Sequence, residues 1–161
     1  MRTSLLKESY AEHFKKAPGM YAACCAGSVP ETTRVVAAWA EVDAGLIHFV
    51  VSDPYSVRFL ENAKVPQRIS LVAVTLGDFE AYQYKGEIVR CAPADAAALA
   101  EVERYVEAFC ALVVHVGIDP LRYPVGFVDG PYTTITMKAD VIFDQTPRVG
   151  AGAVIDKTEV A

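Results

Sequence analysis

Four side chains that could bind a phosphate group lie within residues 31–59. They are Arg34, Ser52, Ser56 and Arg58. Guanidinium groups form charge-assisted hydrogen bonds with phosphate oxygens, and serine hydroxyls add further donors. Pro54 suits the first position of a helix, and the N-terminus of a helix attracts anions. This pattern predicts a site for a phosphorylated ligand.

The elements expected around these residues bring them to neighbouring points. Residues 32–41 and 46–52 are β-rich runs joined by a turn at 43–45, which predicts a hairpin. A helix is expected over about 54–63, with Ser52 or Asp53 as its cap. Arg34 then lies on the first strand, Ser52 at the end of the second, and both Ser56 and Arg58 on the helix.

The rest of the sequence predicts two more helices and four more strands. An amphipathic helix is expected within residues 4–16, and its apolar face would carry Leu6, Tyr10, His13 and Phe14. A long helix should run from Pro93 to about residue 114, with an apolar face made of Leu99, Val102, Val106, Phe109 and Val113. The further strands are expected at 20–27, 68–76, 79–90 and 132–143. Residues 115–131 hold too many Gly and Pro for a regular element and suggest a functional or interface loop, and 144–161 form a tail.

This order of elements predicts one domain, residues 1–161, with a mainly β fold plus helices. The strands arrive in adjacent pairs with mostly short connections, which is typical of antiparallel sheets rather than of parallel α/β folds. Six strands of this kind predict a small antiparallel barrel, closed or nearly closed. Closure would hide the edges of a highly apolar sheet.

Composition limits the partners that the chain can have. The net charge is -5, the pI is near 5.2, and the basic residues are scattered, so we expect no nucleic acid and no membrane as partner. The hydrophobic fraction of 53% and the mean hydropathy of +0.24 favour a homodimer, because one monomer would expose much of this apolar surface. The absence of a signal core or a spanning segment favours a cytoplasmic location.

The cysteine and histidine spacings predict no metal site. Cys24, Cys25, Cys91 and Cys110 do not follow zinc-ligand spacing, and buried, reduced thiols are expected. Cys24 and Cys25 are adjacent on a strand and should point to opposite faces. His48 and His115 lie in apolar runs and are expected to be hydrogen-bonded core or interface residues. No nucleophile, general acid or general base can be named, so the catalytic residues stay unknown.

The ordered set of segments resembles the pyridoxamine 5'-phosphate oxidase-like family of FMN-binding split barrels. The resemblance runs from about Met20 to Arg90, and its segments are Arg34-Val35-Val36, the strand ending at Ser52, Ser56-Val57-Arg58, residues 62–71 and Tyr84-Lys85-Gly86. It implies a six-stranded antiparallel split barrel with FMN at the interface of a homodimer. It also implies that Arg34, Ser52, Ser56 and Arg58 bind the FMN phosphate.

Further residues take a role by the same resemblance. Val35 and Val36 would offer backbone groups to the flavin ring, and Gln83 would reach the ring or its ribityl chain. Asp53 would repel a phosphate unless it faces away from it. The Trp, Arg and His positions with which true pyridoxamine phosphate oxidases hold their substrate have no match in the tail, so that activity is not expected.

The resemblance implies an FMN-dependent oxidoreductase that passes electrons from a reduced nicotinamide to a small-molecule redox substrate not identified by the sequence. Two alternatives stay open at this stage. The barrel could bind another cofactor, deazaflavin or haem, or the chain could be a non-catalytic ligand-sensing dimer.

Overall fold

An antiparallel sheet that curls into a barrel forms the centre of the molecule. The computed structural model describes residues 4–115, 117, 119 and 129–158. The strands in this part are β1 (Gly19–Ala26), β2 (Val29–Arg34), β3 (Ala37–Glu41), β4 (Leu46–Ser52), β5 (Arg68–Val74), β6 (Ala81–Pro93), β7 (Tyr132–Asp144) and β8 (Val154–Lys157). Their order in the sheet is β2-β1-β5-β6-β7-β4-β3, and β8 pairs with β7. The predicted mainly β antiparallel fold is confirmed.

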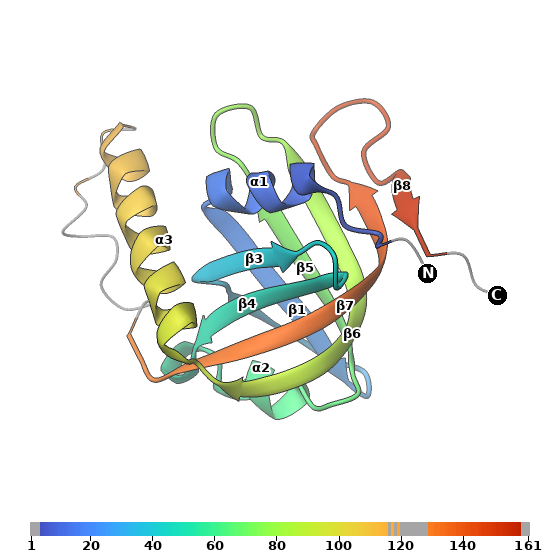
Figure 1. The fold of residues 1–161 in the computed structure, drawn as a ribbon, viewed down its shortest axis with the longest axis vertical. Helices are drawn as coiled ribbons and strands as arrows, with labels where there is room; N and C mark the ends of the chain where they lie inside the picture. The colour runs from blue at the N-terminus through green and yellow to red at the C-terminus, as the bar shows by residue number, and fades with distance from the viewer. Residues whose placement is uncertain (1–3, 116, 118, 120–128, 159–161) are drawn as a thin grey trace.

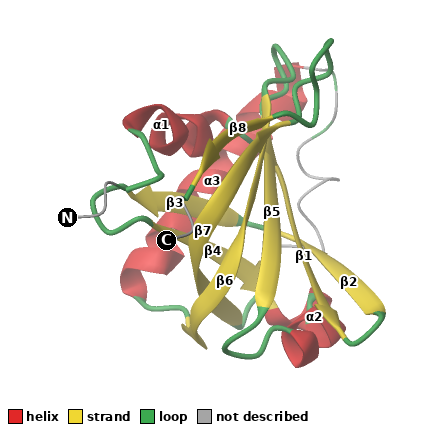
Figure 2. Cartoon of the chain, turned by 90° about the vertical axis from the view of Figure 1, so that its right-hand side faces the viewer, coloured by secondary structure: helices red, strands yellow, loops and turns green. Residues whose placement is uncertain are grey.

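The helices lie at the two ends and along one side of the barrel. They are α1 (Glu8–Lys16), a 3₁₀ turn η1 (Asp53–Tyr55), α2 (Val57–Asn62) and α3 (Ala96–His115). Figures 1 and 2 show α1 and α2 at opposite ends of the strands, with α3 running beside the sheet. The predicted apolar face of the first helix is confirmed for Tyr10, His13 and Phe14, which are buried on α1. Leu6 is buried too, but it precedes the helix, which begins at Glu8 rather than near residue 4.

The seam of the barrel corrects one predicted strand. Residues 32–41 do not form one strand, because the chain changes its pairing partner at Val35 and Val36. The N–H of Val35 donates to the Met20 carbonyl at 3.0 Å, and the N–H of Val36 donates to the Val50 carbonyl at 2.9 Å. As a result β2 pairs with β1, while β3 and β4 form the predicted hairpin. Both valines are fully buried, so their apolar pattern gives no sign of the switch.

Helix α3 begins and faces differently from the prediction. It starts at Ala96 rather than at Pro93, and the Asp95 carboxylate accepts the N–H of Ala98 at 2.9 Å, as an N-cap does. Its buried side chains are Ala98, Val102, Tyr105, Phe109 and Val113. Leu99, expected on the apolar face, is 40% exposed, and Tyr105, which we did not expect there, is 5% exposed. Most of the predicted apolar face is nevertheless confirmed, because Val102, Phe109 and Val113 are buried and Val106 packs against the core.

Two strand details were also missed. The tail contains β8, a short strand of mostly exposed residues whose pattern carries little signal. Strand β6 continues to Pro93, and its Gly86 lies so close to β7 that an added Cβ would come within 2.0 Å of the Lys138 carbonyl oxygen. At Gly86 the pairing of β6 with β7 shifts register inside a continuous strand pair.

The cysteines confirm one prediction and correct another. Cys24 is buried and Cys25 is exposed, as residues on opposite faces of a strand must be. Burial raises the pKa of Cys24 to about 11, so its thiol stays protonated at neutral pH. Cys91 is exposed as well, which contradicts the expectation of four buried thiols.

The described residues lack both a metal-binding cluster and a membrane-spanning helix. They contain no group of three or more His, Cys, Asp or Glu side chains that could hold a metal ion. None of the helices within them is long and apolar enough to cross a membrane.

Candidate functional site

A hollow of about 220 Å³ opens between β2 and the segment formed by η1 and α2. Polar and charged side chains line much of it, which distinguishes it from the barrel interior. Its lining includes Glu31, Thr32, Tyr55, Ser56, Val57 and Arg58. Two of the predicted phosphate-binding residues, Ser56 and Arg58, therefore meet at one site.

Ser56 immediately precedes α2, which begins at Val57 rather than at about residue 54 as predicted. It is 2% exposed, and its Oγ shares a hydrogen bond of 2.6 Å with the Oγ1 of buried Thr33. The predicted caps are wrong, because neither η1 nor α2 has a side-chain cap hydrogen bond. Thr33 was missed by the sequence analysis, although its hydroxyl next to Arg34 in an apolar run could have drawn attention to it.

Arg58 lies on the rim of the hollow, 74% exposed, and its Nε is 2.9 Å from a carboxylate oxygen of Glu31. The Glu31 side chain is 21% exposed and also lines the hollow. An anion that binds Arg58 must therefore share it with Glu31 or displace that carboxylate. Asp53, which was expected to repel a phosphate, does not line the hollow. The carboxylate that would repel a phosphate there is that of Glu31.

Ser52 has its hydroxyl engaged away from the hollow. The residue is 1% exposed, and its Oγ donates to the backbone carbonyl of Asp129. This bond fastens the end of β4 to the segment that leads into β7, where Ser52 is paired with Tyr132. In this structure Ser52 closes the barrel wall.

Arg34, Val35 and Val36 also have partners inside the protein. Both valine N–H groups are used in the seam described above, so they cannot donate to a flavin ring. Arg34 directs its guanidinium to α3, where Nη2 donates to the Tyr105 hydroxyl at 3.3 Å and the group lies 4.8 Å from the centre of the Phe109 ring. The structure therefore does not place the Arg34 guanidinium beside Arg58 in the hollow.

Gln83 lies near the other end of the barrel. On β7 its partner is Phe143 and the partner of Ser52 is Tyr132, eleven residues away and about 36 Å along an extended strand. The Gln83 amide donates to Ser70 at 2.9 Å and its oxygen accepts from Gln145 at 3.0 Å. Within one protomer, Gln83 therefore lies at the other end of β7 from the hollow, and its contact with the flavin ring or the ribityl chain stays a prediction.

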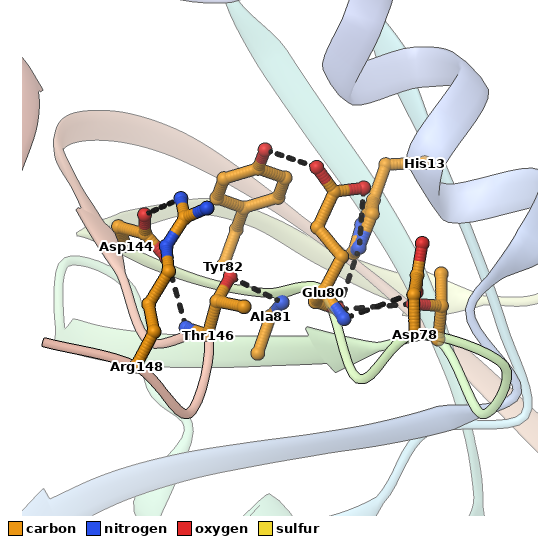
Figure 3. Close-up of polar contacts among 9 residues, drawn as sticks. His13, Asp78, Glu80, Ala81, Tyr82, Asp144, Thr146 and Arg148 are labelled. Atoms are coloured by element: carbon orange, nitrogen blue, oxygen red, sulfur yellow. Dashed lines mark hydrogen bonds and ion pairs between the residues drawn. The ribbon is translucent and has the colours of Figure 1, made fainter. Parts of the chain in front are cut away.

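The polar groups next to Gln83 form a cluster beneath α1 (Figure 3). The Tyr82 hydroxyl donates to the Glu80 carboxylate at 2.7 Å, and the buried His13 ring lies 3.1 Å from the Glu80 carbonyl oxygen. Arg148 and the Thr146 N–H hold the Asp144 carboxylate, and they lower its pKa to about 2. These groups are bonded to one another, so the cluster fastens α1 and the two neighbouring loops together.

Comparison with known proteins rests on structure, because no protein-family model and no curated protein sequence matches the chain. HupZ of Group A Streptococcus is similar with a TM-score of 0.53 and 13% identity, over 92% of this chain and 98% of that one. A Clostridium acetobutylicum protein related to general stress protein 26, of the pyridoxinephosphate oxidase family, gives 0.51 and 16% over 94% and 96%.

A protein from Lactobacillus delbrueckii described as a candidate pyridoxamine 5'-phosphate oxidase gives a TM-score of 0.51 and 14% identity, over 86% of this chain and 93% of that one. At these identities the likeness concerns the fold, and it agrees with the curled antiparallel sheet and its seam between β2 and β3. The predicted resemblance is therefore confirmed at the level of architecture: this chain has the split-barrel fold of the pyridoxamine 5'-phosphate oxidase-like proteins.

Proposed function

We propose that this chain binds FMN as a homodimer and acts as an oxidoreductase, with a reduced nicotinamide as electron donor. The observation that carries the proposal is the hollow beside α2, which both Ser56 and Arg58 line in a chain with the split-barrel fold. These groups suit a phosphate, which accepts hydrogen bonds from both and gains from the positive charge. Bound FMN would supply the redox chemistry through its ring.

The residues of the chain would bind and orient the cofactor rather than react. Arg58 would contact the phosphate from the rim, and Ser56, fixed by its bond to Thr33, would contact it from the floor. The volume of about 220 Å³ accommodates a phosphate and the start of the ribityl chain, so the ring would extend beyond the hollow. An exposed ring would need a second surface to exclude water from it.

Exposed apolar residues around the hollow favour a second copy of the chain as that surface. Tyr55 and Val57 line it and are 53% and 56% exposed, and Val29 on β2 is 52% exposed. Such a group of apolar side chains is commonly covered by a partner. A Val57→Glu variant should lower the fraction of dimer in sedimentation analysis, with the fully exposed Val149→Glu as a matched control.

The test of the proposed function is the visible spectrum of the purified protein, followed by FMN titration of the apoprotein. We expect a flavin spectrum or saturable uptake, weakened about tenfold to a hundredfold by Arg58→Ala. Arg68→Ala is the control, because Arg68 is also an exposed arginine in an ion pair, with Asp140 on the far strands. A Soret band would show that the cofactor is haem rather than FMN. Equal losses of FMN affinity in Arg58→Ala and Arg68→Ala would show that the hollow is not the binding site.

A further inference from the structure

Two aromatic side chains of α3 hold the side chain of Arg34. The guanidinium donates to the Tyr105 hydroxyl at 3.3 Å and lies 4.8 Å from the centre of the Phe109 ring, within the range of a cation–π interaction. The two rings are stacked on each other, with centres 6.0 Å apart and planes inclined by 21°. Arg34 is thus attached to a preformed aromatic pair.

This aromatic pair is buried and hydrogen-bonded to another part of the chain. Tyr105 and Phe109 are 5% and 6% exposed and belong to the buried face of α3. The Tyr105 hydroxyl donates in turn to the Pro18 carbonyl at 2.6 Å, which ties it to the chain just before β1. Because this hydroxyl has one proton, which Pro18 takes, it can only accept from Arg34. The contact with Arg34 is therefore part of the packing of α3 on the barrel.

Arg34 lies on β2 next to the hollow, but its side chain points to α3 and not into the hollow. The preceding residue, Thr33, turns its hydroxyl to Ser56 on the α2 side, and the Arg34 guanidinium turns to the α3 side, as alternation along a strand requires. The backbone of Arg34 is thus one residue from the floor of the hollow, but its guanidinium is absent from the lining. To join Ser56 and Arg58 on a phosphate, the guanidinium must leave the aromatic pair.

We infer that Tyr105 and Phe109 set the affinity of the phosphate site by competing with the phosphate for the Arg34 guanidinium. The inference rests on the proposed function. It adds two residues of α3 that would change the affinity for the ligand without contacting it. Tyr105→Phe removes the acceptor and keeps the ring, and Phe109→Leu removes the π face and keeps an apolar side chain. Each should tighten FMN binding by about three- to tenfold.

The experiment is fluorescence titration of FMN with the full chain and these two variants. Tyr82→Phe is the matched control, since it also removes a partly buried tyrosine hydroxyl, but one bonded to Glu80 beneath α1. In an Arg34→Ala background, Tyr105→Phe should change the affinity by less than about twofold, because the competing group is gone. If Tyr105→Phe leaves FMN binding unchanged or weakens it in the chain that keeps Arg34, the inference is overturned.

The failure of this inference and of the proposed function can be told apart. If neither the wild-type chain nor Tyr105→Phe takes up FMN, the proposed function is wrong, and the competition is then judged with inorganic phosphate alone. Phosphate should raise the melting temperature of Tyr105→Phe by more than it raises that of the wild type. Equal shifts, or none in either protein, would refute the competition.

Discussion

The two ends of the barrel are both covered by a helix, but in different ways. At one end α1 buries Tyr10, His13 and Phe14, and its rings pack against Tyr82 and Tyr84 with centres 4.8 to 5.8 Å apart. At the other end α2 buries only Phe59 and leaves Val57 and Arg58 exposed.

The polar groups at the two ends differ in the same sense. Under α1 the carboxylates of Glu80, Asp144 and Asp156 each accept hydrogen bonds from neighbouring side chains, including Lys7 at 2.8 Å from Asp156. Beside α2 the Arg58–Glu31 pair lies on an open hollow. The comparison indicates that the α1 end contributes mainly to stability and that the α2 end is free to bind a ligand.

The largest effect is expected from Phe14→Ala at the α1 end. Phe14 is 2% exposed and its ring centre is 5.0 Å from that of Tyr84, so the variant leaves a cavity in the core. The free energy of unfolding should fall by about 3–5 kcal/mol in urea titration. Val149→Ala, at a fully exposed position, is the control. A loss as small as that of the control would show that α1 is not an anchor.

Ser56→Ala should act on both properties at the α2 end. The variant leaves the buried Thr33 hydroxyl without its 2.6 Å partner, which should cost about 1 kcal/mol in the free energy of unfolding. FMN affinity should fall by about tenfold, since one donor to the phosphate is lost. A change in stability with no change in FMN affinity would give Ser56 a purely structural role and weaken the contrast between the two ends.

Glu31→Gln should tighten FMN binding by about three- to tenfold. The carboxylate is 2.9 Å from Arg58 and lines the hollow, so its removal releases Arg58 and takes away a charge that repels phosphate. Titrations at low and high salt should differ more for the variant than for the wild type, because the uncompensated charge of Arg58 attracts the phosphate and salt screens that attraction. Glu61→Gln, on the exposed part of α2, is the control. Weaker binding would instead mean that Glu31 orients Arg58 for the ligand.

The smallest effect is expected on the loss of stability at alkaline pH, to which Tyr82 at the α1 end contributes. Burial, followed by the hydrogen bond to Glu80, raises the pKa of Tyr82 from 10.0 to about 12. Because the folded pKa lies above the unfolded one, this contribution to stability is complete below pH 10 and is lost as the pH rises towards 12. Tyr82→Phe should flatten that decline in urea titrations at pH 9 to 11. A slope equal to that of the wild type would exclude Tyr82 as its source.

Residue pattern predicts the elements of this chain better than it predicts where their side chains go. Alternation and turn residues identified the β3–β4 hairpin, and the apolar face of α1 was found because its spacing is regular. The change of pairing partner between Val35 and Val36 could not be predicted, because both residues are apolar and buried and continue the pattern of a single strand. Periodicity also tolerates a shift of one position, as Leu99 and Tyr105 on α3 show.

The candidate site was predicted in part for a related reason. Ser56 and Arg58 lie two residues apart on one short segment, so local structure is enough to bring them to the hollow. The orientation of the Arg34 side chain depends on α3, which lies some seventy residues further along the chain. The orientation of the Ser52 hydroxyl depends in the same way on its hydrogen bond to the Asp129 carbonyl. Contacts at such separation leave no trace in the spacing of neighbouring residues.

The seam at Val35 and Val36 has a consequence for how the barrel closes. The two edge strands of the sheet, β2 and β3, are consecutive in the chain and are joined by these two residues alone. The entropy of closing a loop grows with its length, so a two-residue connection keeps that cost near its minimum. The covalent chain therefore closes the barrel at this point, where the end of β2 and the start of β3 cannot separate by more than the span of one dipeptide.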